Sequence, residues 1–140
     1  MTNKQIQLVK KTWKIFRNIH PTVVGDVFYS KLFTDTPALQ KMFPKDMNAQ
    51  YKKLIDMLSA VIARLDNLDV LTEDIAAMAK RHVGYGVKSN HYKKVGEALL
   101  WTLQQGLGSE WSNEIEDAWL TCYTILSQTM INATTEKTIK

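Results

Sequence analysis

The sequence is poor in cysteine and has no long apolar run. Cys122 is the only cysteine among 140 residues, so an intramolecular disulfide is excluded and a reducing compartment is indicated. No stretch approaches the roughly 18 consecutive apolar residues of a membrane-spanning helix. The N-terminus begins with polar and basic residues and has no apolar signal region. These absences predict a cytoplasmic protein without a membrane partner.

Sequence motifs of several enzyme classes are also missing. The chain has no Walker loop, no dinucleotide-binding fingerprint and no nucleophile elbow. The three histidines, His20, His82 and His91, form no i, i+3 or i, i+4 pair, which argues against a zinc site built from protein ligands alone. Cys122 falls on an apolar stripe with Trp119, where a thiol behaves as a small hydrophobic group rather than as a nucleophile. The sequence therefore predicts no catalytic residue.

The charge balance is mildly basic. The net charge is +4 and the isoelectric point about 9.1, but the lysines occur as scattered pairs at positions 10–11, 52–53 and 93–94. Scattered pairs are typical of a solvated surface, so we expect no nucleic-acid partner. A hydrophobic content of 45% with charges of both signs excludes a disordered chain. The length suits a single core, and we expect one domain over residues 1–140.

The periodic segments of the sequence are helical. No segment alternates apolar and polar residues as a strand would, and no internal repeat is present. Apolar residues recur instead at intervals of three and four, which predicts an all-α fold of six main helices. A short helix or 3₁₀ turn capped by Thr36-Pro37 is expected between the second and the third. The main helices are predicted near residues 3–18, 21–33, 48–65, 72–83, 92–107 and 112–133, with a polar tail from about Ala133.

Several of these helix ends carry capping signals. Thr2 and Gln5 fit a capping box at the start of the first helix. Thr72 is followed by two acidic residues, which suit the positive end of a helix dipole, so we predict it as the N-cap of the fourth helix. Gly106 and Gly108 are predicted to close the fifth helix.

The fourth helix presents a histidine on its inner face. Leu71, Ile75, Met78 and His82 follow at intervals of four, three and four residues, so they share one side of the helix. Gly84 and a second glycine two residues later then break the helix. A lone histidine on such a face is either a hydrogen-bonded core residue or a ligand. Because this histidine lies beside a glycine loop, its ring could approach a large, flat group.

Three other residues each allow two interpretations. Gly25 lies one turn before Tyr29 and marks either a close helix crossing or a tolerated surface glycine. Phe43, just before a proline, is either a hydrophobic plug or part of a pocket wall. Gln50 is aligned with an apolar stripe and lies either at a solvated rim or in a polar cavity.

The inward histidine and two isolated polar groups suggest one kind of chemistry. Tyr29 and Gln50 each contribute a polar group to an otherwise apolar lining that faces the helix of His82. This arrangement suits a single axial ligand for a large planar cofactor, with hydrogen-bond donors on the far side of that cofactor.

The order of these landmarks resembles the globin family over essentially the whole chain. The nearest resemblance is to bacterial single-domain globins and to the haem domain of flavohaemoglobins. It implies a three-on-three helical sandwich around one haem b (iron protoporphyrin IX). The residues and segments that carry the resemblance are Trp13, Pro21, Gly25, Thr36-Pro37, Phe43, KRHVGYGV and HYKKVGEALL.

The resemblance also implies roles for individual residues. His82 matches the proximal ligand of the iron, and Tyr92 matches a tyrosine on the same side. Tyr29 and Gln50 match distal residues that contact the bound gas, and Leu54 is the apolar residue one turn beyond Gln50. The implied cofactor-binding set is Phe43, Leu54, His82, Val87, Tyr92 and Val95.

One position departs from the flavohaemoglobin pattern. Where that family has a glutamate that bonds the proximal histidine, this chain has Thr134, with Glu136 two residues further on and therefore on another helix face. We therefore expect His82 to donate its remaining N–H to a backbone carbonyl near Met78 or Ala79 and to stay a neutral imidazole.

The function implied by the resemblance is reversible, high-affinity binding of O₂, with NO and CO as further ligands. Two alternatives remain open. One is NO dioxygenation with electrons from a separate reductase, because no flavin or nicotinamide reductase domain follows the globin-like segment. The other is a haem-based gas sensor.

Overall fold

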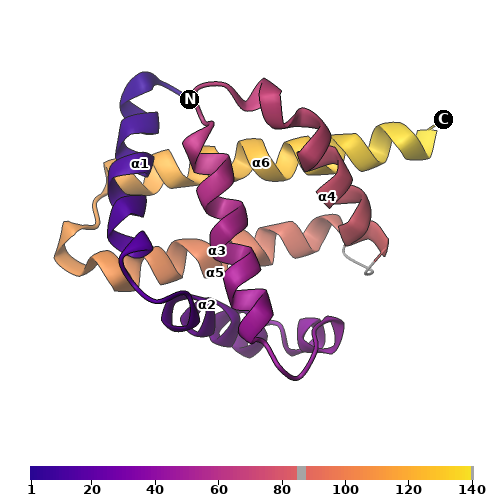
Figure 1. Cartoon of the computed structure of the whole chain (residues 1–140), viewed down its shortest axis with the longest axis horizontal. Coiled ribbons are helices and arrows are strands. Elements are labelled where there is room, and N and C mark those ends of the chain that lie inside the picture. The colour runs from indigo at the N-terminus through magenta and orange to yellow at the C-terminus, as the bar shows by residue number, and fades with distance from the viewer. Residues whose placement is uncertain (85–87, 140) are drawn as a thin grey trace.

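Within the residues described, the chain of this computed structural model forms six α-helices joined by short turns (Figure 1). These residues are 1–84 and 88–139, with the backbone alone for residues 84, 89 and 134–139. No strand occurs in these ranges, and the all-α prediction is confirmed. The α-helices are α1 (Asn3–Arg17), α2 (Pro21–Asp35), α3 (Asn48–Ala63), α4 (Thr72–Gly84), α5 (Ser89–Leu107) and α6 (Asn113–Ile139). The 3₁₀ helices are η1 (Pro37–Met42), η2 (Leu68–Leu71) and η3 (Gly108–Glu110).

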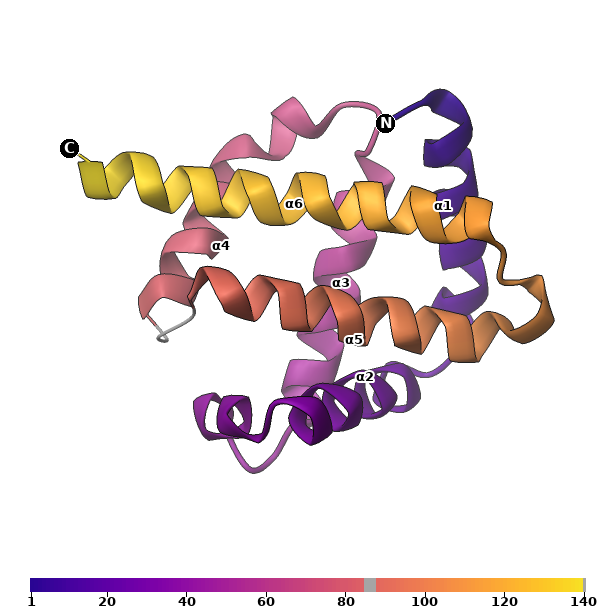
Figure 2. The same cartoon turned by 180° about the vertical axis from the view of Figure 1, so that it is seen from behind.

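The helices form crossed layers. α5 and α6 run side by side, and α1, α3 and α4 cross them on one side (Figures 1 and 2). α2 packs against both α3 and α5, and so joins the layers at one edge. α1 and α4 both pack on α6, towards its opposite ends (Figure 2). None of the described helices is long and apolar enough to cross a membrane.

The first helix begins as its sequence predicts and then anchors the last helix. The Gln5 amide donates to the Thr2 hydroxyl over 3.1 Å, and the Thr2 amide donates to the Gln5 side chain over 3.0 Å, so the capping box is confirmed. Further along α1, the rings of Trp13 and Trp119 lie 5.9 Å apart in the core. The Trp119 indole N–H donates to the buried Thr12 hydroxyl over 2.8 Å. This bond ties α1 to α6.

Gly25 lies at a close crossing of α2 and α3. A Cβ atom at Gly25 would stand 2.6 Å from the Cβ of Tyr51 on α3, nearer than real Cβ atoms approach one another. Gly25 is buried, as are Tyr29 and Leu32 on the same side of α2. The glycine therefore allows a close helix crossing, and the interpretation as a surface glycine is wrong.

Two predicted caps are not caps in the structure. Thr72 has helical dihedral angles (φ −53°, ψ −47°) and is the first residue within α4, because η2 leads directly into that helix. Gly106 lies inside α5, where a Cβ would stand 2.5 Å from the Phe16 ring, so it serves packing rather than termination. Gly108 does end α5, with φ at +56°, a value that suits glycine.

One other helix boundary follows the prediction, and two differ from it. η1 begins at Pro37 with Thr36 in the N-cap position, as predicted. The Thr36 side chain makes no capping bond, and among the described residues its buried hydroxyl has no hydrogen-bond partner. α5 begins at Ser89, earlier than the predicted Tyr92. α6 runs past Ala133 to Ile139, so helical backbone continues into the segment expected to be a tail.

Candidate functional site

His82 lies near the end of α4 and is half-buried. Its Nδ1 lies 2.7 Å from the carbonyl oxygen of Met78, one turn earlier. A carbonyl can only accept a hydrogen bond, so Nδ1 carries the proton, and Nε2 is the ring nitrogen that can act as a metal ligand. The predicted bond to a backbone carbonyl is therefore confirmed. It fixes the tautomer and the ring orientation that a metal ligand needs.

The other two histidines accept backbone hydrogen bonds at the starts of helices. The Nδ1 of His20 accepts a hydrogen bond from the Thr22 amide over 3.1 Å at the start of α2. The Nδ1 of His91 accepts from the Lys88 amide over 3.0 Å at the start of α5. In both rings the local backbone occupies the lone pair on Nδ1. Among the three histidines, His82 alone uses Nδ1 as a donor within its own helix.

Tyr29 and Gln50 meet across the crossing of α2 and α3. The Gln50 side-chain amide donates to the Tyr29 hydroxyl oxygen over 3.1 Å, which leaves the phenolic proton for a further acceptor. Tyr29 is only 5% exposed, and burial raises its pKa, an effect that the Gln50 bond partly opposes. Gln50 itself is half-buried. Its contact with a buried phenol favours the polar-cavity interpretation over the solvated rim.

Phe43 belongs to an aromatic cluster around Tyr29. Its ring centroid lies 5.3 Å from that of Tyr29 and 5.4 Å from that of Phe33, at angles typical of favourable aromatic contacts. Its backbone is extended at the end of η1, as expected before a proline. The cluster also includes Tyr51, whose ring lies 5.9 Å from that of Tyr29. Sequence reasoning missed Tyr51, although a glycine at a helix crossing calls for a bulky partner.

The remaining candidate residues have apolar side chains that the protein only half covers. Leu54 on α3 and Tyr92 and Val95 on α5 are half-buried, like Phe43. Among the described helices, α3 packs mainly on α2 and α1, whereas α4 packs on α6 and η2, so α3 and α4 are not close-packed neighbours. Apolar side chains left half covered between such helices fit a flat, largely apolar group. The residues present therefore suit the planar cofactor expected from the sequence.

The segment around Tyr92 is fixed by the last helix. The Tyr123 hydroxyl on α6 donates to the backbone oxygen of Tyr92 over 2.5 Å, and burial raises the pKa of both phenols. A Cβ at Gly96 would stand 2.6 Å from the Tyr123 ring, so the two helices touch closely here. Sequence reasoning missed this contact of Tyr123, because it joins residues that are distant in sequence. The predicted contact of Val87, and the side chains of Thr134 and Glu136, lie outside the described residues.

Comparisons with known proteins agree with this arrangement. The globin family profile matches residues 26–130. The chain is 30% identical to an uncharacterized globin-like protein of Aquifex aeolicus, over 94% of this chain and 92% of that one. It is 27% identical to the flavohemoprotein of Vibrio cholerae, over 94% of this chain but only 34% of that protein, so it spans about a third of that relative.

A solved structure supports the same conclusion. A bacterial globin from Campylobacter jejuni superposes with a TM-score of 0.86 at 25% sequence identity, over 99% of this chain and all of that one. This likeness confirms the predicted fold. The chain belongs to the globin family.

Proposed function

We propose that the chain is a single cytoplasmic globin domain that holds haem b through His82 and reversibly binds O₂, with NO and CO as further ligands. Relatives in the globin family bind haem. The observation that carries the proposal is the 2.7 Å contact from Nδ1 of His82 to the Met78 carbonyl. Because Nδ1 is engaged in this contact, we assign Nε2 as the nitrogen that binds iron.

The haem, when bound, supplies a ferrous iron at which a diatomic gas binds. The protein has to hold this group away from water and to recognise the gas. The half-buried surface of Phe43, Leu54, Tyr92 and Val95 suits the first task, since covering apolar area contributes about 25 cal/mol per Å². The same apolar cover lowers the local dielectric constant and strengthens every polar contact inside the pocket.

Tyr29 and Gln50 suit the second task. Because Gln50 donates to the Tyr29 oxygen, the phenolic proton is directed towards another acceptor, and bound O₂ is a better acceptor than CO. A hydrogen bond to a charged group contributes about 1.5–3 kcal/mol. At about 1.4 kcal/mol per decade, one such bond tightens O₂ binding roughly tenfold to a hundredfold.

The three histidines provide a matched test of the proximal assignment. We expect His82→Ala to lose the Soret absorption of bound haem, whereas His20→Ala and His91→Ala retain it, because those two rings cap helices. Absorption spectra of the three purified variants, each reconstituted with equimolar haem, give the answer. Normal haem content in His82→Ala would overturn the assignment, and so would a six-coordinate deoxy ferrous spectrum of the unmodified protein.

The distal assignment is tested by the rates of gas release. We expect Tyr29→Phe to speed O₂ release by about ten- to a hundredfold while barely changing CO release, and Gln50→Leu to act in the same direction more weakly. Stopped-flow displacement of each gas measures these rates. Tyr51→Phe is the control, because that hydroxyl lies 3.5 Å from Asp26 in an exposed contact. Equal acceleration for O₂ and CO would mean that the two residues control the exit route instead.

A second candidate function is NO dioxygenation supported by a separate reductase. Similarity to flavohemoproteins favours it, since their name indicates a flavin carried together with haem. The carbonyl partner of His82 argues for binding instead, because a carboxylate partner would push more electron density to iron. Resonance Raman on the deoxy ferrous protein separates the two. We expect an iron–histidine frequency in the neutral-imidazole range, and an imidazolate-range frequency would favour the enzyme.

A further inference from the structure

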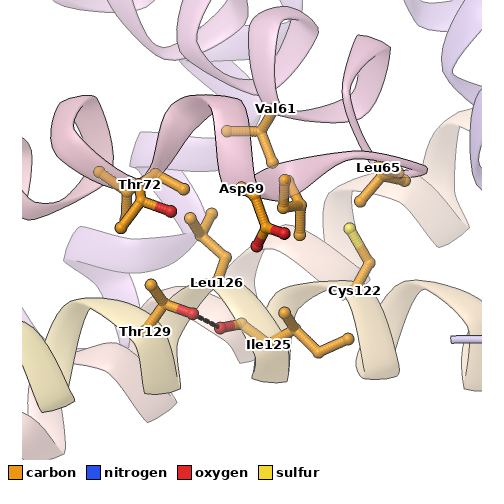
Figure 3. Close-up of a pocket in the computed structure, with 10 residues that line it drawn as sticks. Val61, Leu65, Asp69, Thr72, Cys122, Ile125, Leu126 and Thr129 are labelled. Carbon is orange, nitrogen blue, oxygen red and sulfur yellow. Dashed lines mark hydrogen bonds between the residues drawn. The ribbon is translucent and has the colours of Figure 1, made fainter.

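None of the aromatic residues around Tyr29 lines a second cavity, which has a volume of about 260 Å³ (Figure 3). It opens where the end of α3, η2 and the first turn of α4 meet the middle of α6. Its floor is apolar and buried, formed by Val61, Leu65, Ile75 and Leu126, with the Cys122 thiol beside them. Water gains few hydrogen bonds on such a floor, so an apolar occupant is favoured over water.

The mouth of the cavity is polar and carries a negative charge. Asp69 is exposed at the rim, and Figure 3 shows its carboxylate turned towards α6. Within the described part of the chain, no lysine or arginine forms an ion pair with Asp69. The neighbouring Asp66, by contrast, lies 4.0 Å from the Lys10 ammonium. On the α6 side, the Thr129 hydroxyl donates to the Ile125 carbonyl over 2.7 Å, so its oxygen remains an acceptor. The rim thus offers acceptors to a cation.

We propose that this cavity binds a small organic ammonium ion, with its apolar body on the floor and its charged group at Asp69. An engineered apolar cavity of about 150 Å³ takes up benzene, so about 260 Å³ accommodates one aromatic ring with a short chain. The proposal does not depend on the gas-binding function, because none of the lining residues belongs to the site described above.

The test uses the haem-loaded full chain in its ferrous CO form, in which an added amine does not displace the iron ligand. The probes are benzylammonium and toluene, which share a ring and differ in charge. Saturation-transfer NMR and calorimetry measure the binding of each probe. The binding site is located by the protection of Cys122 from a small alkylating reagent, which intact-protein mass spectrometry detects. We expect both probes to protect the thiol, benzylammonium about three- to tenfold more tightly, with the difference reduced by salt.

Three variants decide the outcome. Asp69→Asn should lower the affinity for benzylammonium to that for toluene. Asp66→Asn, the matched exposed control, should leave the affinity for benzylammonium unchanged. Leu126→Phe should fill the floor and abolish binding of both probes. Asp69 is exposed, so its variant remains informative even if Leu126→Phe does not fold. Equal affinity for the two probes, equal effects of the two aspartate variants, or binding without Cys122 protection would each overturn the proposal.

Discussion

At the scale of single residues, Thr12 joins the two ends of the fold. Its hydroxyl donates to the Leu8 carbonyl over 2.8 Å and accepts the Trp119 indole N–H over 2.8 Å, with Thr12 only 5% exposed. Thr12→Val keeps the shape and removes the acceptor, so the indole N–H is left buried and unpaired. We expect a loss of about 1–3 kcal/mol in the free energy of unfolding, measured by urea denaturation.

The control for this variant is Thr121→Val on the same helix as Trp119. The Thr121 hydroxyl donates to the Asp117 carbonyl over 2.8 Å in an exposed contact, so its removal should cost well under about 1 kcal/mol. Thr12→Ser should retain most of the stability because it keeps the acceptor. If Thr12→Val and Thr121→Val cost the same, the buried bond to Trp119 does not stabilise the fold.

Cys122 makes the stability of the protein dependent on pH. Burial raises the pKa of its thiol from an ordinary 9.0 to about 12. Below pH 9 the thiol is neutral in both the folded and the unfolded chain. Between pH 9 and 12 only the unfolded chain loses the proton, so stability falls as pH rises through this window. Between pH 8 and pH 10, the thiol should lower the free energy of unfolding by about 1 kcal/mol.

The comparison with Cys122→Ala isolates the contribution of the thiol. The buried tyrosines titrate in both proteins, so their contribution cancels in the difference. Urea midpoints measured from pH 8 to 10.5 should fall more steeply for the unmodified protein than for the variant. Parallel curves would show that the thiol does not keep its proton in the folded state.

At the scale of helices, the crossing of α2 and α3 is set by Gly25 and Tyr51. Gly25→Ala gains up to about 1 kcal/mol in helix propensity but places a Cβ 2.6 Å from the Tyr51 Cβ. Overpacking of this kind costs about 1–3 kcal/mol, so we expect net destabilisation in urea denaturation. In a Tyr51→Gly background both the Cβ and the ring of residue 51 are absent, so the change Gly25→Ala should lower the free energy of unfolding by less. Equal effects in both backgrounds would contradict the proposed contact.

Much of the helical architecture was predictable because it depends on neighbours in sequence. The start of α1, the proline start of α2 and the inner stripe of α4 all follow from spacing and local caps. Gly106 was misassigned because its partner, Phe16, is distant in sequence and appears only in the folded chain. Ile55 and Ile62 are also buried, because α3 packs on both α1 and α2 and so needs a wide apolar face, which depends on the folded chain.

In the candidate site, too, a contact within one helix was predictable, whereas a contact between two helices was not. The bond from His82 to Met78 spans one helical turn and was therefore predictable. The bond from Gln50 to Tyr29 joins two helices, and spacing alone could not choose between a solvated rim and a cavity. The resemblance to globins was needed to assign Gln50 to the pocket rather than to the rim.

At the scale of the whole molecule, α4 and α2 differ in the elements that pack against them. Among the described elements α4 packs on α6 and η2, whereas α2 contacts α3, α5 and η1. If haem lies against His82, it supplies the support that α4 lacks on its other side, and a ligand that binds only the folded chain stabilises it. We expect removal of haem to lower the melting temperature and to speed hydrogen exchange most in residues 72–84.

Hydrogen exchange followed by mass spectrometry, with and without haem, checks this expectation. Residues 3–17 of α1 are the internal control, since Thr12 and Trp13 hold this helix to α6 and α3. Equal acceleration in α1 and α4 would mean that haem stabilises the molecule uniformly. Unchanged exchange in α4 would place its support elsewhere.

Within the described residues, three helix contacts pair a glycine with an aromatic ring: Gly25 with Tyr51, Gly96 with Tyr123 and Gly106 with Phe16. In each, the ring occupies the space that a Cβ would need. A substitution at only one of the two positions is therefore destabilising. A larger residue in place of the glycine would collide with the ring, and a smaller residue in place of the aromatic one would leave a cavity. Descendants of this sequence should exchange the two members of each pair together, and each pair should covary across an alignment more strongly than its neighbours do.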